Sequence, residues 1–229
     1  MCGIIGYSGP KEPLPILIGG LSRLEYRGYD SAGVAILDGE KLTIEKKEGK
    51  LQILKDHLEN SKINGNIGIG HTRWATHGVP NDVNAHPHSD NQKEFAIIHN
   101  GIIENYAEMK DDLLKEDFIF ESDTDTEVVA VELGNQWTGR LLETVTNVAK
   151  KLDGTYALVV TSTKEPGTIV AGRMMSPLVL GVGEGETFLA SDSAAILEHT
   201  NKMIFLENGD FVEITNGKFK LFDINMNEI

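Results

Sequence analysis

Hydrophobic residues recur at helical spacing in several parts of the chain. Over residues 13–24 a leucine or isoleucine appears every three or four positions, with prolines in the first turn. Similar spacing covers residues 102–116 and 141–152. A further helix is predicted to start at Thr124, because Thr124 and Glu127 have the spacing of a capping box. These patterns predict four helices.

Elsewhere, short apolar runs alternate with turn signals and predict strands. Five turn signals separate such runs: Asp38-Gly39, Pro166-Gly167, Asn208-Gly209, Asn216-Gly217 and the glycine-rich "GVGEGE". Tight hairpins join antiparallel strands, because parallel strands need long crossover connections. The predicted fold class is therefore α+β, with antiparallel sheet and helices packed on its outer faces.

Two of the predicted strands, "GIIGY" and "ALVVT", are continuously apolar, which indicates that both of their faces are covered. Two such sheets stacked between helices would make four layers. The chain shows no internal repeat, low-complexity stretch or linker, so we expect residues 1–229 to form one domain.

The charge balance narrows the choice of partners. The 229 residues include 21 basic and 35 acidic side chains, a net charge of −14. Such a surface repels phosphate backbones and anionic lipids, so we expect neither nucleic acid nor membrane as a partner. No apolar run approaches the ~20 residues that span a bilayer, and the N-terminus lacks the features of a signal peptide. With a single cysteine, this favours a cytoplasmic protein.

That single cysteine, Cys2, is the first candidate for chemistry. Removal of Met1 would give Cys2 a free α-amine, whose pKa lies near that of a thiol. A nucleophile and its base would then share one residue. The alternative is a small cysteine without chemistry near a chain end.

Two later stretches carry further candidates. In "GIGHTRWATHG", Ile67 and Ile69 indicate a strand, and the loop after it presents Arg73, whose planar guanidinium suits a carboxylate. A surface loop with a stacked Arg-Trp pair is an equal alternative. In "EFAIIHNGIIENY", Asn100-Gly101 follows an apolar strand. We interpret it as a turn before a helix, which could form an oxyanion hole; the alternative is an ordinary hairpin turn.

The acidic stretch "ESDTDTE" permits a divalent-cation site, but helix capping by Thr124 is better supported, and an EF-hand is excluded by its spacing. Asp125 near that cap could receive a substrate ammonium group. Together with Arg73, it would suit an amino acid. His86 and His88 superficially resemble a metal-ligand pair, but no zinc motif accompanies them, and we predict no metal site.

Seven motifs occur in order: "MCGIIGY", "LEYRGYDSAG", "HTRWATHG", "NAHPH", "HNGIIENY", "SDTDTE" and "LDGTYAL". Taken together, they resemble the glutaminase domains of the glucosamine-6-phosphate synthases, the glutamine–fructose-6-phosphate aminotransferases. The resemblance covers nearly the whole chain. It implies a class II glutamine amidotransferase domain with the N-terminal-nucleophile (Ntn) hydrolase fold, a four-layer αββα sandwich.

The resemblance also implies roles for single residues. Cys2 matches the nucleophile and its own α-amine the general base, and the pair Asn100 and Gly101 matches the oxyanion hole. L-Glutamine would be hydrolysed through a Cys2 γ-glutamyl thioester, without a cofactor. The other matches are Arg73 with Thr76 and His77 for the substrate carboxylate, Asp125 for its ammonium group, Trp74 as a gate to an ammonia channel, and Arg27 as a supporting residue.

Two departures from the family follow. In this family, a sugar-phosphate isomerase portion uses the ammonia to make glucosamine 6-phosphate from fructose 6-phosphate. That portion would lie beyond Ile229. We expect the full-length enzyme to be a homodimer. If Met1 is retained, the Cys2 nitrogen is an amide, and the protein should be nearly inactive. The alternatives are an amidophosphoribosyltransferase-like domain, a non-catalytic glutamine-binding module and a metal-dependent hydrolase using the histidines.

Overall fold

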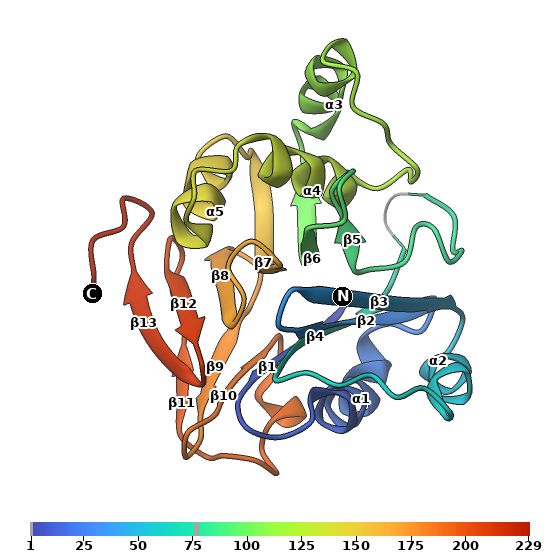
Figure 1. The fold of residues 1–229 in the computed structure, drawn as a ribbon, viewed down its shortest axis with the longest axis vertical. Helices are drawn as coiled ribbons and strands as arrows, with labels where there is room; N and C mark the ends of the chain where they lie inside the picture. The colour runs from blue at the N-terminus through green and yellow to red at the C-terminus, as the bar shows by residue number, and fades with distance from the viewer. Residues whose placement is uncertain (1, 76–77) are drawn as a thin grey trace.

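Two antiparallel β-sheets face one another in the computed structural model, which describes residues 2–75 and 78–229 (Figure 1). The seven-stranded sheet has the order β11-β9-β10-β1-β4-β2-β3. Its strands are β1 (Gly3–Ser8), β2 (Ser31–Asp38), β3 (Lys41–Glu48), β4 (Ile67–Arg73), β9 (Val179–Val182), β10 (Thr187–Ala190) and β11 (Met203–Phe205). The six-stranded sheet has the order β13-β12-β8-β7-β6-β5. Its strands are β5 (His88–Ser89), β6 (Phe95–Ile103), β7 (Gly154–Ser162), β8 (Thr168–Met174), β12 (Phe211–Thr215) and β13 (Lys218–Phe222).

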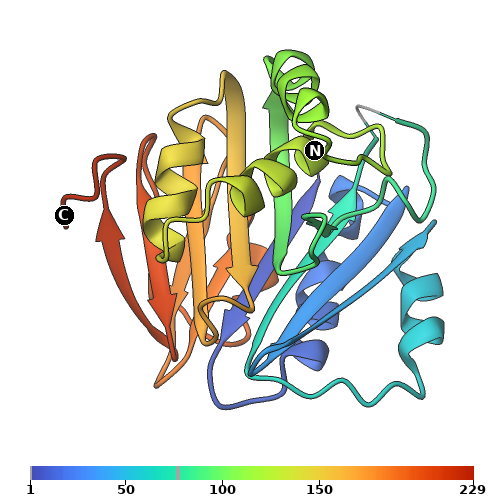
Figure 2. The same cartoon turned by 45° about the horizontal axis from the view of Figure 1, so that its top comes forward.

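Helices cover the outer face of each sheet (Figure 2). The helices are α1 (Pro13–Leu24), α2 (Leu51–Leu58), α3 (Tyr106–Lys115), α4 (Asp125–Asn135) and α5 (Leu141–Ala149), with short 3-10 turns η1 (Glu25–Arg27) and η2 (Ser193–Ala195). Helices α1 and α2 pack on the seven-stranded sheet, whereas α4 and α5 pack on the six-stranded sheet. The prediction of an α+β fold in four layers is therefore confirmed.

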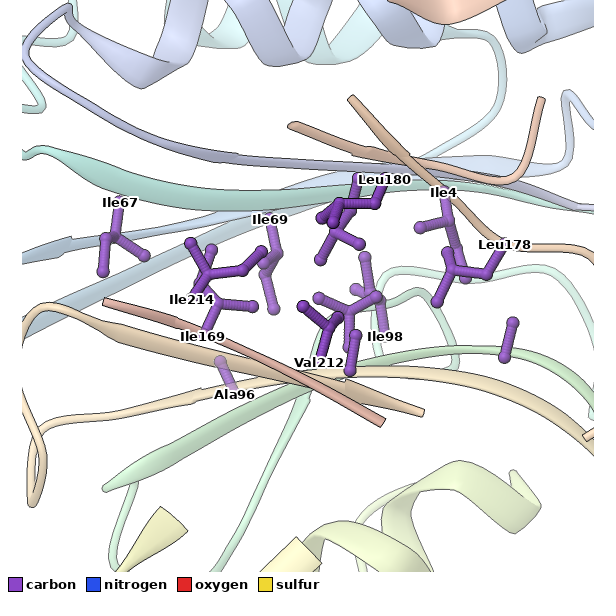
Figure 3. Close-up of a cluster of buried hydrophobic side chains, with 14 of the residues drawn as sticks. Ile4, Ile67, Ile69, Ala96, Ile98, Ile169, Leu178, Leu180, Val212 and Ile214 are labelled. Carbon is purple, nitrogen blue, oxygen red and sulfur yellow. The ribbon is translucent and has the colours of Figure 1, made fainter. Parts of the chain in front are cut away.

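The central layer of the core lies between the two sheets, where Ile4 and Ile69 meet Ile98 and Val212 (Figure 3). The next residue of β1, Ile5, points to the other face and packs with α1. This alternation explains why "GIIGY" is apolar throughout: each residue has a buried face. Burying a side chain of this size contributes about 1.5–3 kcal/mol, so the stacking of the sheets is strongly specified.

Four of the five predicted hairpins are confirmed: β2–β3, β7–β8, β9–β10 and β12–β13. The hairpin at Asn208-Gly209 is wrong. The strand before it, β11, pairs with β9 in the seven-stranded sheet, whereas β12 pairs with β8 and β13 in the other. The turn is held by β8 and the residue after it instead, because Gly209 N donates to Arg173 O at 2.8 Å and Met175 N donates to Asn208 Oδ1 at 2.8 Å. It carries the chain from one sheet to the other.

The interpretation of Asn100-Gly101 as a turn before a helix is also wrong. Strand β6 continues to Ile103, with Gly101 opposite Tyr156 of β7, and α3 begins only at Tyr106. Gly101 has a φ of 134°, and a Cβ there would lie 2.0 Å from the carbonyl oxygen of Thr155. The glycine therefore serves a close approach between strands rather than a turn.

The predicted start of α4 is confirmed. The Thr124 side chain accepts a hydrogen bond from Glu127 N at 3.3 Å, which satisfies one of the free donors of the first turn. The Glu127 carboxylate accepts from Glu121 N at 2.8 Å and Ser122 N at 2.7 Å, so it holds the approach to the helix rather than closing a capping box. Within the described residues, no helix is long and apolar enough to cross a bilayer.

Candidate active site

Cys2 directly precedes β1 of the seven-stranded sheet. Because β1 pairs with β4 with Gly3 opposite Thr72, the residue before Gly3 lies beside the end of β4. Trp74 N donates to Cys2 Sγ at 3.1 Å, and the thiol reaches Trp74 O at 3.5 Å. Burial raises the pKa of the Cys2 thiol, and the Trp74 N–H opposes that rise because it stabilises a thiolate.

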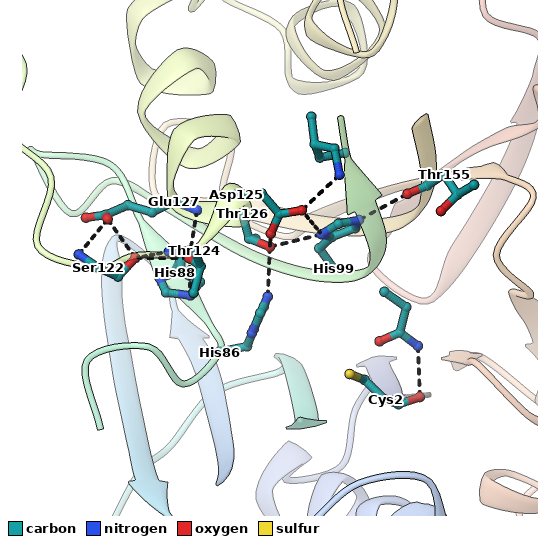
Figure 4. A network of polar contacts seen from close by, with 12 residues as sticks. Cys2, His86, His88, His99, Ser122, Thr124, Asp125, Thr126, Glu127 and Thr155 are labelled. Carbon is teal, nitrogen blue, oxygen red and sulfur yellow. Dashed lines mark hydrogen bonds and ion pairs between the residues drawn. The ribbon is translucent and has the colours of Figure 1, made fainter. Parts of the chain in front are cut away.

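Asn100 reaches Cys2 from the other sheet. Its position in β6 places the side chain between the sheets, with only 8% of the residue exposed. Asn100 Nδ2 donates to Cys2 O at 3.0 Å, the contact drawn as a dashed line at Cys2 in Figure 4. The stacking of the sheets thus joins the candidate nucleophile to a carboxamide donor 98 positions away in the chain.

A cavity of about 270 Å³ opens beside this contact. Seven of the predicted site residues line it: Cys2, Arg27, Arg73, Trp74, Asn100, Gly101 and Asp125. The other two, Thr76 and His77, lie outside the residues that the structure describes, as does Met1.

Opposite charges lie on the cavity wall. Arg73 is the last residue of β4, and its guanidinium donates to Gly78 O at 3.2 Å. Burial lowers the pKa of Arg73, whereas the charges of Cys2, Asp30 and Asp125 act in the opposite direction. Asp125 opens α4 and accepts from Ile103 N at 2.9 Å, with 5% of the residue exposed. A buried cation and a buried carboxylate in one cavity can hold the two charged ends of an amino acid.

Trp74 and Arg27 lie at the rim of this cavity. The Trp74 residue is 46% exposed, and its ring meets Tyr29 edge-on at 5.6 Å. Arg27 donates to Asp192 Oδ2 at 2.6 Å, and its Nε donates to the Tyr26 hydroxyl at 3.1 Å. Arg27 is therefore held by Asp192 and Tyr26 while it remains part of the cavity wall.

A short segment that the sequence analysis did not assign holds the loop after β4. Asp30 N donates to Arg73 O at 3.0 Å, and Asp30 Oδ2 accepts from Ala75 N at 2.6 Å. A Cβ at Gly28 would lie 2.7 Å from Arg73 O, so the segment passes directly against the loop. This segment lies within the motif "LEYRGYDSAG", but only the pairing of β2 with β4 shows which residues the segment contacts.

Three histidines surround the start of α4 (Figure 4), and two of them, His86 and His99, line the cavity. Thr126 Oγ1 lies 2.9 Å from both His86 Nε2 and His99 Nδ1, and His88 Nε2 lies 3.0 Å from Thr124 Oγ1. Burial holds the pKa values of His86 and His88 well below the usual range, so both rings are neutral. Among residues 2–75 and 78–229, no three His, Cys, Asp or Glu side chains group as metal ligands.

Comparison with known proteins gives the same indication as the motifs. A family model described as a glutamine amidotransferase domain matches residues 55–221. The glutamine–fructose-6-phosphate aminotransferase (isomerizing) of Aquifex aeolicus is 50% identical over 97% of this chain, and that of Thermococcus kodakarensis is 48% identical over all of it. The chain spans 38% of the length of each of these relatives.

Solved structures support the fold. The glutamine phosphoribosylpyrophosphate amidotransferase of B. subtilis, complexed with ADP and GMP, superposes with a TM-score of 0.86 at 29% identity, covering 99% of this chain and 50% of that one. A structure described as the allosteric regulatory enzyme of purine biosynthesis gives 0.87 at 28% identity over 99% of this chain and 50% of that one. These matches agree with the expected Ntn-type sandwich. The chain therefore belongs to the glutamine amidotransferase family.

Proposed function

We propose that this domain, residues 1–229, hydrolyses the side-chain amide of L-glutamine to glutamate and ammonia. One observation carries the proposal: Cys2 and the Asn100 carboxamide meet across the two sheets, on a cavity that also contains a buried arginine and a buried aspartate. A nucleophile, an oxyanion donor and two charged anchors together match the needs of amide hydrolysis on an amino acid.

The reaction begins at Cys2 after removal of Met1. The freed α-amine takes the thiol proton, and the thiolate attacks the δ-carbon of the glutamine amide. The amide of Asn100 carries two N–H groups. One of them binds Cys2 O, and we assign the other, with the Gly101 N–H, to the tetrahedral oxyanion. The protonated α-amine gives its proton to the departing ammonia, and water then hydrolyses the γ-glutamyl thioester to glutamate.

Recognition of the substrate uses the charged wall of the cavity. We assign the glutamine α-carboxylate to Arg73, with Thr76 and His77 beside it, and the α-ammonium group to Asp125. Arg73 can bind a carboxylate through two parallel N–H groups, which fixes the substrate more firmly than a point charge does. These residues position the amide carbon against Cys2 and make no bonds to it.

In a longer protein, we propose that the ammonia passes to a sugar-phosphate isomerase portion that converts fructose 6-phosphate to glucosamine 6-phosphate. The names of the relatives, which are about 50% identical and more than twice as long, support this proposal. On this proposal, Trp74 gates the passage of ammonia, Arg27 supports the site, and the full-length enzyme is a cytoplasmic homodimer. The lower identity of 29% to the phosphoribosylpyrophosphate enzyme makes that substrate the second choice.

The first test is the intact mass of the protein after incubation with a glutamine analogue that carries a diazoketone in place of the amide. Attack by the thiol expels N₂ and leaves a stable adduct, and the same spectrum reports whether Met1 has been removed. We expect one adduct on the Met1-free protein and none on Cys2→Ala. A Met1-free protein without adduct would contradict the catalytic proposal and leave a glutamine-binding module.

A second assay measures glutamate and ammonia release from L-glutamine by the Met1-free protein with and without a metal chelator. We expect equal rates in both. Loss of activity with chelator, restored by added metal, would favour a metal-dependent hydrolase built on the histidines instead.

A further inference from the structure

His71 lies directly behind Asn100, between the two sheets. It belongs to β4 of the seven-stranded sheet, is fully buried, and faces Asn100 of β6 in the opposite sheet. His71 Nε2 lies 3.1 Å from His99 O and 3.0 Å from Asn100 Oδ1. One ring nitrogen thus contacts the backbone that precedes Asn100 and the Asn100 side chain together.

The chemistry of these contacts fixes the proton on the ring. A backbone carbonyl oxygen is only an acceptor, so the short contact with His99 O requires a hydrogen on His71 Nε2. The Asn100 atom beside the same N–H must then be an acceptor, which is Oδ1. The opposite end of the carboxamide agrees, because Nδ2 lies 3.0 Å from Cys2 O, also only an acceptor. Both ends therefore give the same orientation of the Asn100 side chain.

The other ring nitrogen shows why this state is stable. Within the described residues, His71 Nδ1 is buried without a hydrogen-bond partner, and the ring stacks on His86 at 4.2 Å. A hydrogen on Nδ1 would be an unsatisfied buried donor, which is costly. Burial also lowers the pKa of His71 to about 3, although the hydrogen bond to Asn100 acts in the opposite direction. The ring is thus neutral at physiological pH, with its one hydrogen on Nε2.

We propose that His71 is a positioning residue that locks the Asn100 carboxamide with Nδ2 toward Cys2; this rests on the proposed glutaminase function. Without the Nε2 hydrogen, Asn100 can rotate by half a turn about its terminal side-chain bond. Oδ1 would then face the developing oxyanion, and an attractive contact would become a repulsive one. His71 therefore acts on the transition state through Asn100 and touches no reacting atom.

The test compares His71→Leu with His71→Gln in the Met1-free protein. His71→Leu removes the donor, and we expect kcat for glutamine hydrolysis to fall about 10- to 100-fold, part of the loss for a missing oxyanion donor. KM should stay within about twofold, because Arg73 and Asp125 are unchanged. The rate of Cys2 alkylation by iodoacetamide should be unchanged, because that reaction needs no oxyanion donor. His71→Gln carries an amide N–H near the Nε2 position and should recover much of kcat.

The matched control is His57→Leu, a histidine on α2 that contacts Glu45 and lies outside the cavity. We expect wild-type kcat and KM from it. An unchanged kcat in His71→Leu would overturn the proposal. A parallel fall of kcat and alkylation rate, with no recovery in His71→Gln, would also overturn it, because it would indicate a packing role alone.

The unaltered protein provides a measurement that does not depend on how the variants fold. Nitrogen-15 NMR of labelled histidine distinguishes the two neutral forms of the ring and the charged form. We expect His71 to be neutral and protonated on Nε2 from pH 5 to 8. A hydrogen on Nδ1, or titration within that range, would overturn the proposal. This result is independent of activity, so it remains decisive even if the Met1-free protein proves inactive and the proposed function fails.

Discussion

Two of the cavities in the described part of the chain differ greatly in character. The larger, about 420 Å³, is lined by residues of β3, β5 and α4, including Lys46, His88 and Glu127. Its polar groups bind neighbouring groups of the protein: Lys46 donates to Val83 O and Ala85 O, at 3.0 and 2.8 Å. Burial lowers the pKa of Lys46 to about 8, although nearby acidic groups oppose it. The smaller cavity, about 270 Å³, brings a thiol, a carboxamide and two opposite charges to one surface.

The proposed active site therefore rests on the convergence of chemical groups at the smaller cavity and not on cavity volume. In the larger cavity, Lys46 and Glu127 hold neighbouring segments of chain in place through hydrogen bonds. The Glu127 carboxylate accepts from Glu121 N and Ser122 N. In the smaller one, the Asn100 amide reaches toward Cys2 from another sheet. We therefore expect substitutions at the smaller cavity to change activity and those at the larger cavity to change stability.

The largest effect is expected at Cys2. Cys2→Ala should lower glutaminase activity at least about 10⁴-fold, because no other group can form the thioester. Initial rates of ammonia release measure this. The control is Lys46→Met at the larger cavity, which should keep its rate within about twofold. Equal losses of activity in both variants would contradict the assignment of catalysis to the smaller cavity.

Loss of the oxyanion donor should come next. Asn100→Ala is expected to cost about 2.7–4 kcal/mol of transition-state stabilisation, a fall in kcat of about 10²- to 10³-fold. Steady-state kinetics with glutamine separate kcat from KM. A variant that raises KM but retains kcat would show that Asn100 binds substrate rather than the oxyanion.

A smaller effect is expected at Arg73. Arg73→Met should raise KM for glutamine about 10- to 100-fold, as expected for losing charged hydrogen bonds worth about 1.5–3 kcal/mol. The exposed Arg140, which binds Glu213 at 3.2 Å, provides the control. Arg140→Met should leave KM unchanged, since surface ion pairs contribute little. An unchanged KM in Arg73→Met would contradict the assignment of the carboxylate site.

The smallest expected effect concerns stability at His88, on the larger cavity. Burial holds its pKa well below 6.5 in the folded protein, so below pH 6.5 the unfolded chain binds a proton that the folded one does not. Stability should therefore fall as pH falls from about 6.5, by about 1.4 kcal/mol per pH unit for one histidine. Urea unfolding at pH 7.5, 6.5 and 5.5 gives the free energy of unfolding at each pH. Between pH 6.5 and 5.5, its slope against pH should be smaller by that amount in His88→Gln than in the unaltered protein. An identical slope would show that His88 is charged in the fold.

Local signals predicted the fold where the chain nearby decides the outcome. Thr124 and Glu127 are three residues apart, and the helix starts where they indicate. Asn216-Gly217 joins two strands that pair with each other, as its neighbours predicted. The same dipeptide was misinterpreted at Asn100-Gly101 and at Asn208-Gly209. Nothing local shows that β7 pairs along all of β6 or that β11 and β12 belong to different sheets.

Seven of the proposed site residues that the ordered motifs indicated line one cavity. The motifs could not show how these residues are held. Asp30, which anchors Ala75, and His71, which orients Asn100, lie within quoted motifs without a local sign of their roles. Their partners lie 45 and 29 positions away. Such contacts depend on strand register and on the stacking of the sheets.

The sequence by itself determined the α+β class, most of the turns and the cap of α4, and its ordered motifs indicated the proposed site residues. The class, the turns and the cap follow from the spacing and type of neighbouring residues, which act over a few positions. The tertiary structure alone decided that Cys2 and Asn100 meet, that Gly101 lies in a strand, and that His71 stands behind the carboxamide. Those contacts require two sheets to pack face to face, and that packing is fixed by the whole buried core rather than by any one segment.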